Sequence, residues 1–197
     1  MNHIRKPEMT HRGRFLAAVN HQPTDRVPLD YWGVPEFTEK LMKHFGVRGH
    51  LDLIKAMDLD CPMGVGGFLV KPGRHGEWDV EMKKIPLPDG SGFYDEPVRH
   101  PIGGYETIDE IEASYEWPTT DMFDYSNIKK QCELYHREGF AVEGGYISLT
   151  YFYEIIRGTE QMLLDLAGDP ELAEYILLKI NEFASAHTQK YWKPETV

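Results

Sequence analysis

The stretch Phe140–Gly158, FAVEGGYISLTYFYEIIRG, decides the fold that we predict for this chain. Its first half is a short apolar run interrupted by Gly144 and Gly145, and its second half has helical spacing. This pattern indicates a buried strand followed by a loop and a helix. Ligands of α/β proteins bind where such strands end. We therefore expect a binding site just after this strand.

Polar and aromatic side chains are concentrated around the end of this predicted strand. They are Glu143, Tyr146, Tyr153, Glu154 and Arg157. The alternative interpretation is structural: a Gly-Gly turn, and a surface ion pair between Glu154 and Arg157, which lie three residues apart on one helix face. The residues alone leave both interpretations open.

The composition is that of a globular protein with a real core, since 41% of its 197 residues are hydrophobic. The net charge of −11 argues against nucleic acid and anionic membranes as partners. No apolar run approaches the ~20 residues of a membrane span, and the first residues lack the apolar core of a signal peptide. We therefore expect a cytoplasmic protein. Cys61 and Cys132 stand alone in sequence and are interpreted as buried thiols.

The rest of the chain alternates helices with strands, which predicts an α/β fold with a parallel sheet. Strands are predicted at 25–33 and 58–68, and helices at 10–19, 35–45, 51–57, 107–111, 124–136, 159–168 and from 170 to about 192. Three glycines, Gly64, Gly66 and Gly67, end the second strand without forming a GxGxxG or GxxxxGK motif. We interpret them as room for close packing of the backbone.

Residues 78–100 interrupt this rhythm and are interpreted as a β-hairpin insertion. Trp78, Val80 and Met82 alternate with charged residues, and a glycine-rich turn separates them from a second extended segment at 93–98. Alternation on both sides of such a turn is typical of a hairpin.

The segment Met9–Pro28, MTHRGRFLAAVNHQPTDRVP, closely resembles the opening of the uroporphyrinogen decarboxylase superfamily, particularly its methyltransferase-like branch. The resemblance continues through Tyr115–Pro118, Tyr153–Glu160 and Asp169–Glu171. It implies a (β/α)8 TIM barrel with its site at the C-terminal ends of the strands. Because about three barrel strands are present, 1–197 is expected to be one domain that forms the N-terminal half of such a barrel.

An open half barrel leaves strand edges and apolar surface uncovered, so a C-terminal half or a second copy is expected as its partner. The methyltransferase branch moves a methyl group between a corrinoid protein and a small molecule, using zinc held by a His-x-Cys pair and a later Cys. Neither Cys61 nor Cys132 has that motif. We therefore expect no cofactor within this chain, and assign zinc and corrinoid chemistry to the second half.

If the chain contributes to such a site, the resemblance and the strand ends together suggest the residues. Glu154, Arg157 and Asp30 are the catalytic candidates, with Glu154 accepting a proton and Arg157 holding it ionised. Four further residues are candidates for binding the substrate, and of these Trp32 would form a wall against a flat face. They are Trp32, Asp60, Tyr153 and Tyr146.

Two other functions stay open. The first is uroporphyrinogen decarboxylation. The resemblance implies that such a decarboxylase would use two arginines just after the first strand to hold its substrate. Residues 30–37 contain none, and a substrate with several carboxylates needs cations. The second is a non-catalytic half barrel that self-associates.

Overall fold

The computed structural model describes residues 8–73, 75–145 and 147–192. Over these residues the chain is a mixed α/β protein, mostly helical, with small two-stranded sheets. It divides into two compact units. The first contains the described parts of Met1–Val65 and Ile128–Gly144, and the second those of Gly66–Asn127 and Gly145–Val197. The described strands do not close into a barrel.

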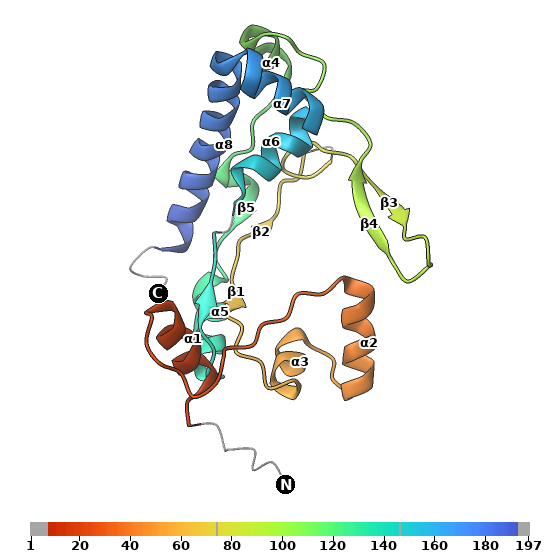
Figure 1. Ribbon diagram of the computed structural model, residues 1–197. Coiled ribbons are helices and arrows are strands. Elements are labelled where there is room, and N and C mark those ends of the chain that lie inside the picture. Colours follow the sequence, from red (N-terminus) through yellow and green to blue (C-terminus); the bar gives the residue numbers. More distant parts are fainter. Residues whose placement is uncertain (1–7, 74, 146, 193–197) are drawn as a thin grey trace. The chain divides into compact units, whose positions relative to one another are not determined.

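The first unit contains four helices and one parallel pair of strands among its described residues (Figure 1). Its elements are α1 (His11–Val19), α2 (Pro35–Phe45), α3 (His50–Ala56), β1 (Met63–Gly64), α5 (Ile128–Arg137) and β6 (Val142–Glu143). In the pair, Met63 lies opposite Val142 and Gly64 opposite Glu143. The buried core of this unit consists of Ile54, Leu59, Cys61, Met63 and Phe140.

Helix boundaries in this unit follow local signals that can be read in the sequence. The Thr10 side chain caps α1 by accepting a hydrogen bond from the Gly13 backbone N–H at 3.0 Å. Pro35 occupies the first turn of α2, and Gly46 ends it with φ of 68°, a left-handed conformation that favours glycine. The three helices predicted over residues 10–57 are therefore confirmed.

The strands of this unit are shorter than predicted. Residues 25–33 are irregular, and 58–68 yields only β1 and the start of β2. Pro28 has no N–H to donate, and the Leu29 N–H donates to the Asp60 carboxylate at 3.0 Å instead of to a backbone carbonyl. One backbone bond remains, from Asp60 N–H to Leu29 C=O at 2.8 Å.

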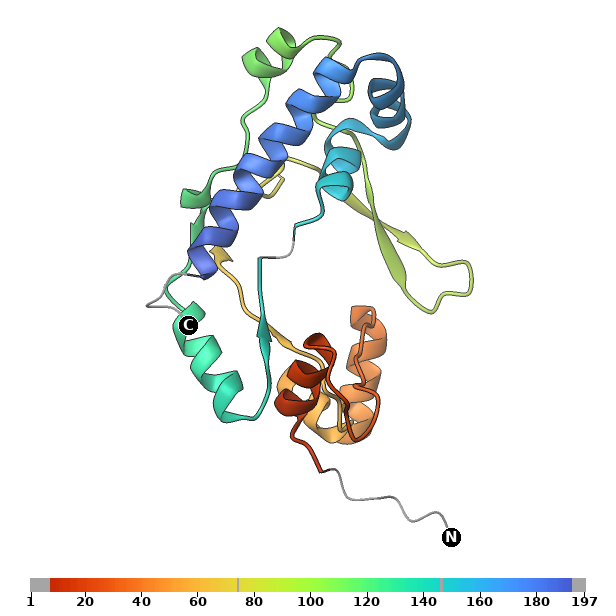
Figure 2. The ribbon, with the colours of Figure 1, turned by 60° about the vertical axis from the view of Figure 1, so that its left-hand side comes forward.

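Over its described residues the second unit consists mainly of helices, with two antiparallel strand pairs (Figure 1). Its elements are β2 (Phe68–Leu69), β3 (Met82–Pro86), β4 (Phe93–Pro97), α4 (Ile108–Ser114), the short 3-10 helix η1 (Thr120–Met122), β5 (Phe123–Asp124), α6 (Leu149–Arg157), α7 (Thr159–Gly168) and α8 (Pro170–Tyr191). Strand β2 pairs with β5, and β3 pairs with β4. The helices α6 and α7 both pack on α8 (Figures 1 and 2).

Helix α8 supplies much of the core of this unit. Its buried stripe consists of Leu172, Ala173, Ile176, Ile180, Phe183, His187 and Tyr191. The Asp169 side chain caps α8 by accepting from the Leu172 N–H at 3.1 Å, and Pro170 follows in its first turn. The predicted long helix ending near Trp192 is therefore confirmed.

The predicted hairpin is also confirmed, within narrower limits. Strands β3 and β4 pair from Met82 opposite Pro97 to Pro86 opposite Phe93. Trp78 and Val80 belong to the predicted alternation but lie outside the strands and are buried in the core of the second unit. The part of 78–100 that projects as a hairpin is thus confined to the strands and their turn.

The glycines that follow β1 pack against the C-terminal end of α8 and its neighbours, as the close-packing interpretation predicts for Gly67. A Cβ at Gly67 would lie 2.9 Å from the Tyr125 ring, and one at Gly66 would lie 3.7 Å from the Tyr191 hydroxyl. Gly145, with φ of 74°, lies against Thr188 in the same way. Glycine is needed at Gly67 and Gly145, where neighbouring side chains approach the backbone directly, whereas a Cβ at Gly66 would make ordinary contact and one at Gly64 would meet no atom within 4 Å.

Two further expectations concern cysteines and membranes. Cys61 and Cys132 are both buried and unpaired, as predicted. Within residues 8–73, 75–145 and 147–192, no helix combines the length and the apolar character needed to cross a bilayer.

Replacing Gly67 tests the close approach of Tyr125. We expect Gly67→Ala to lower the free energy of unfolding by about 1–3 kcal/mol, because the ring must move away from the new Cβ. Urea denaturation measures this change. Gly104→Ala is the control, since its Cβ would meet no atom within 4 Å, and an equal loss in both variants would contradict the explanation.

Candidate functional site

The candidate site of the first unit is a cavity beside Trp32. The cavity has a volume of about 460 Å³ and is lined by Tyr31, Trp32, Gly33, Pro35, Thr38, Glu39 and His50. Trp32 is 95% exposed, so nearly its whole indole faces solvent. The sequence predicted Trp32 as a binding residue, and the structure places it on the wall of this cavity.

The wall of this cavity is held by contacts within the segment that joins Leu29 to α2. The Tyr31 hydroxyl lies 2.8 Å from the Thr38 hydroxyl, which in turn donates to the Val34 carbonyl at 3.0 Å. A Cβ at Gly33 would lie 2.1 Å from the Tyr31 hydroxyl oxygen. Tyr31 therefore folds directly over the backbone of Gly33, which leaves space for no side chain.

Asp30 precedes this wall and is an exposed residue. Its carboxylate accepts a hydrogen bond from the Tyr31 N–H at 2.7 Å. Burial, followed by the charge of Asp30 and a hydrogen bond to it, raises the pKa of the Cys61 thiol to about 11. Cys61 is therefore a protonated thiol at neutral pH, which makes it a poor nucleophile and a poor metal ligand.

Asp60, the other predicted binding residue of this unit, lies in a buried ion network. Its carboxylate contacts the guanidinium groups of Arg14 and Arg26, a ring nitrogen of His11 at 3.0 Å, and the Leu29 N–H. Burial alone would raise the pKa of Asp60, but the bonds from Leu29, His11 and Arg14 lower it below its ordinary value. The charge of Asp60 is thus matched by charges of the protein itself.

Arg14 is fully buried and links Asp60 to Asp25. Its guanidinium donates to Asp25 through Nε at 2.6 Å and through Nη2 at 2.9 Å, and Nη2 also donates to the Met9 carbonyl. The hydrogen bonds from Arg14 lower the pKa of Asp25. The network fastens the start of α1 and the Leu29 segment to the residues that precede β1.

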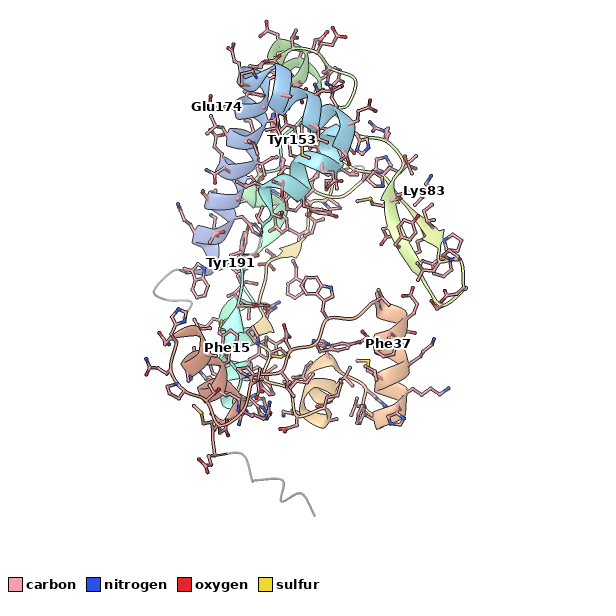
Figure 3. The ribbon with its side chains drawn as sticks, viewed as in Figure 1. Phe15, Phe37, Lys83, Tyr153, Glu174 and Tyr191 are labelled. Carbon is pink, nitrogen blue, oxygen red and sulfur yellow. The ribbon has the colours of Figure 1, made fainter. Side chains whose placement is uncertain are left out.

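In the second unit, Tyr153 and Arg157 share a different carboxylate, that of Asp165. Arg157 Nε and Nη2 donate to it at 2.7 and 3.0 Å, and the Tyr153 hydroxyl donates at 3.0 Å (Figure 3 labels Tyr153 on α6). Arg157 Nη1 donates to the carbonyls of Ile102 and Tyr105 at 2.6 and 2.5 Å. Every nitrogen of this buried guanidinium therefore has a partner.

Glu154 is not the partner of Arg157, so the surface ion pair considered for the two residues is wrong. The Glu154 carboxylate accepts from the Thr159 hydroxyl at 2.6 Å, while Arg157 points inward to Asp165. Although the two residues are three apart on α6, Arg157 is buried beside Asp165 and Glu154 is half-buried beside Thr159. Tyr146, the seventh candidate, lies outside the described residues.

A cluster that the sequence analysis missed lies at the C-terminal end of α8. The His187 ring accepts or donates through Nδ1 to the Tyr125 hydroxyl and through Nε2 to the Tyr191 hydroxyl, both at 2.7 Å (Figure 3 labels Tyr191). Burial lowers the pKa of His187, and it raises that of Tyr125 to about 12. The signal was the spacing of four between His187 and Tyr191, which places both on the buried stripe of α8.

A metal site requires several donor side chains that lie close together. Across 8–73, 75–145 and 147–192, no three His, Cys, Asp or Glu side chains gather as a metal site would require.

In the comparisons with known proteins, no family model, curated protein or solved structure matches the chain.

The Asp60 network makes a direct prediction about stability. We expect Asp60→Asn to lower the free energy of unfolding by about 3–5 kcal/mol, because it leaves the buried Arg14 without one of its two carboxylate partners. Asp58→Asn is the control: Asp58 contacts Arg26 from an exposed position, where a pair contributes at most about 1 kcal/mol. Urea denaturation at neutral pH compares the two, and similar losses would contradict a special role for Asp60.

His187 makes a prediction about pH. Its folded pKa is lowered, so the unfolded chain, with an ordinary value near ~6.5, takes up a proton first as the pH falls. Stability linked to His187 is therefore complete above ~6.5 and is lost below it, by at most about 1.4 kcal/mol per pH unit. We expect His187→Gln, whose amide can still donate and accept, to unfold with a shallower pH dependence between pH 7 and 5. An unchanged slope would show that His187 does not titrate as described.

Proposed function

We propose that this chain forms the first strands of a (β/α)8 barrel of the uroporphyrinogen decarboxylase superfamily type, and that the barrel transfers a methyl group to or from a corrinoid protein. The observation that carries the proposal is the order of three segments in the first unit. The Leu29 carbonyl accepts from Asp60, and β1 then pairs in parallel with β6. The Leu29 segment is irregular and contributes one backbone bond, whereas β1 and β6 form a parallel pair, which is the arrangement that a barrel of this kind requires.

The connection between β1 and β6 supports the same proposal. Parallel strands need a long crossover, usually helical, and the chain between them contains α4 and α5. The hairpin of β3 and β4 is an addition to that crossover. A short ladder such as β1 with β6 fits strands that depend on further neighbours for their length.

Ligands of such barrels bind beyond the C-terminal ends of the strands. Asp30 and Trp32 follow the Leu29 segment directly, and the 95% exposure of Trp32 leaves its ring available to a substrate. We assign Trp32 to substrate binding and Asp30 to its support. Glu154, which Arg157 does not engage, belongs to the second unit, and we assign it no role in the site around Trp32.

Zinc does not fit the residues described. Cys61 is a buried thiol whose pKa is raised, and burial raises that of Cys132 as well. Neither therefore offers the thiolate that zinc ligation uses. We derive no step through a metal for this chain, and its own contribution is to bind the small substrate.

Self-association is the second candidate function, and one observation favours it. A groove of about 380 Å³ on the second unit is almost wholly apolar, and its lining consists of Leu149, Leu166, Pro170, Ala173, Glu174, Leu177, Leu178 and Asn181. Leu166 and Leu178 are each about half exposed. Exposed apolar surface of this kind is typical of a protein interface.

The test of the proposed function is methyl transfer by the polypeptide purified from its natural source. We expect methylcobalamin to lose its methyl group to a thiol, with the carbon–cobalt bond breaking, a carbon–sulfur bond forming and cobalt keeping the electron pair. The absorbance of the cobalamin follows the reaction. Trp32→Leu should slow it at least about tenfold, by analogy with the loss of a buried aromatic contact to a ligand. Trp192→Leu is the matched control.

Four outcomes would count against the proposal or one of its parts. No demethylation by the natural polypeptide would overturn methyl transfer, and equal rates in the Trp32 and Trp192 variants would overturn the role of Trp32. Inactivity combined with a stable dimer in sedimentation velocity would favour self-association instead. Saturable quenching of tryptophan fluorescence by coproporphyrin would favour the decarboxylase alternative.

A further inference from the structure

The cavity beside Trp32 is lined by the indole of Trp32, the phenol of Tyr31, the imidazole of His50 and one carboxylate. Glu39 is the acidic residue of the lining. The lining contains no lysine or arginine. An anionic ligand would therefore meet a carboxylate and no permanent positive charge, which disfavours phosphates and carboxylates.

The aromatic wall is preorganised. The hydroxyl of Tyr31 is held at 2.8 Å by Thr38, and the absence of a side chain at Gly33 lets the ring lie against the backbone. Holding a ring in place before the ligand arrives lowers the entropy cost of binding. The Trp32 indole, by contrast, has almost no protein atoms against it, so its face is available to a ligand.

Aromatic faces attract cations, and indole does so most strongly. A quaternary ammonium group needs no hydrogen-bond acceptor, only ring faces and a nearby negative charge. The cavity of about 460 Å³ holds a small molecule of this kind, and the net charge of −11 favours the approach of a cation. These conditions are met by Trp32, Tyr31 and Glu39 together.

We infer that the cavity lined by Trp32, Tyr31 and Glu39 binds a small organic cation of the quaternary ammonium class. This inference rests on the proposed function in one respect: in methyl transfer the cation is the methyl donor to the corrinoid, because a quaternary nitrogen has no electron pair with which to accept a methyl group. The binding itself depends on the three side chains.

Choline and its neutral isostere 3,3-dimethyl-1-butanol are the probes, because they share their shape and differ in charge. Isothermal titration on the full chain, supported by quenching of tryptophan fluorescence, measures both affinities. We expect choline to bind saturably and the alcohol to bind roughly tenfold more weakly, within the range of cation–π energies. Glu39→Gln should weaken choline by a few fold and leave the alcohol unchanged.

Variants separate this site from general effects on folding. Trp32→Leu should abolish choline binding without changing the circular dichroism spectrum, because the indole is 95% exposed. Trp192→Leu, which alters another indole that is about half exposed, should leave choline binding as it is. Gly33→Ala should weaken binding by displacing Tyr31.

Equal affinity for choline and the alcohol, or no binding of choline at millimolar concentration, would overturn the inference. Loss of choline binding in the Trp192 variant would overturn its location. Choline binding without methyl transfer would leave the cation site standing and the proposed function refuted. Methyl transfer without choline binding would do the reverse.

Discussion

The first unit depends on the charge of Asp60. This carboxylate receives Arg14, Arg26 and the Leu29 N–H in a place where water does not reach it. A lone buried charge would cost several kcal/mol. The network is stable because each of its buried charged groups has a partner of opposite charge or a hydrogen-bond partner. The position of Leu29 follows from it, and with Leu29 the beginning of the segment that carries Trp32. The ion network thus fixes the start of the segment that carries the exposed Trp32.

The second unit uses buried polar groups in the same way. The Arg157 guanidinium has five donor N–H groups, and the Asp165 carboxylate and two backbone carbonyls accept from all three of its nitrogens. His187 is likewise held at both ring nitrogens by tyrosine hydroxyls. Fully partnered groups such as these fix a fold and have little capacity left for a ligand. The side chains with that capacity are the exposed ones, and Trp32 is the clearest example.

Helices could be predicted from this sequence better than strands, for physical reasons. Caps and stops are local: Thr10 before α1, Gly46 after α2 and Asp169 before α8 each act within one turn. Strand pairing is not local. The Leu29 N–H donates to the Asp60 carboxylate, 31 residues further along the chain, and no local sequence pattern indicates this pairing. The site was predicted in the same uneven way. Trp32 lies on a cavity wall although the strand expected to end beside it is absent, and the choice of Asp165 over Glu154 by Arg157 depends on tertiary packing.

The glycines illustrate how one residue type can suggest two functions. A run such as Gly64, Gly66 and Gly67 is compatible with a loop that binds a ligand through its backbone, and equally with tight packing. Tyr125 against Gly67 and Thr188 against Gly145 show that side chains of the protein occupy the space that a ligand would need there. At Gly33 the absence of a side chain again lets a ring approach the backbone. Here the ring, that of Tyr31, forms part of the wall of a cavity that stays open. What decides between the two functions is therefore whether the neighbouring ring closes the space or forms its wall.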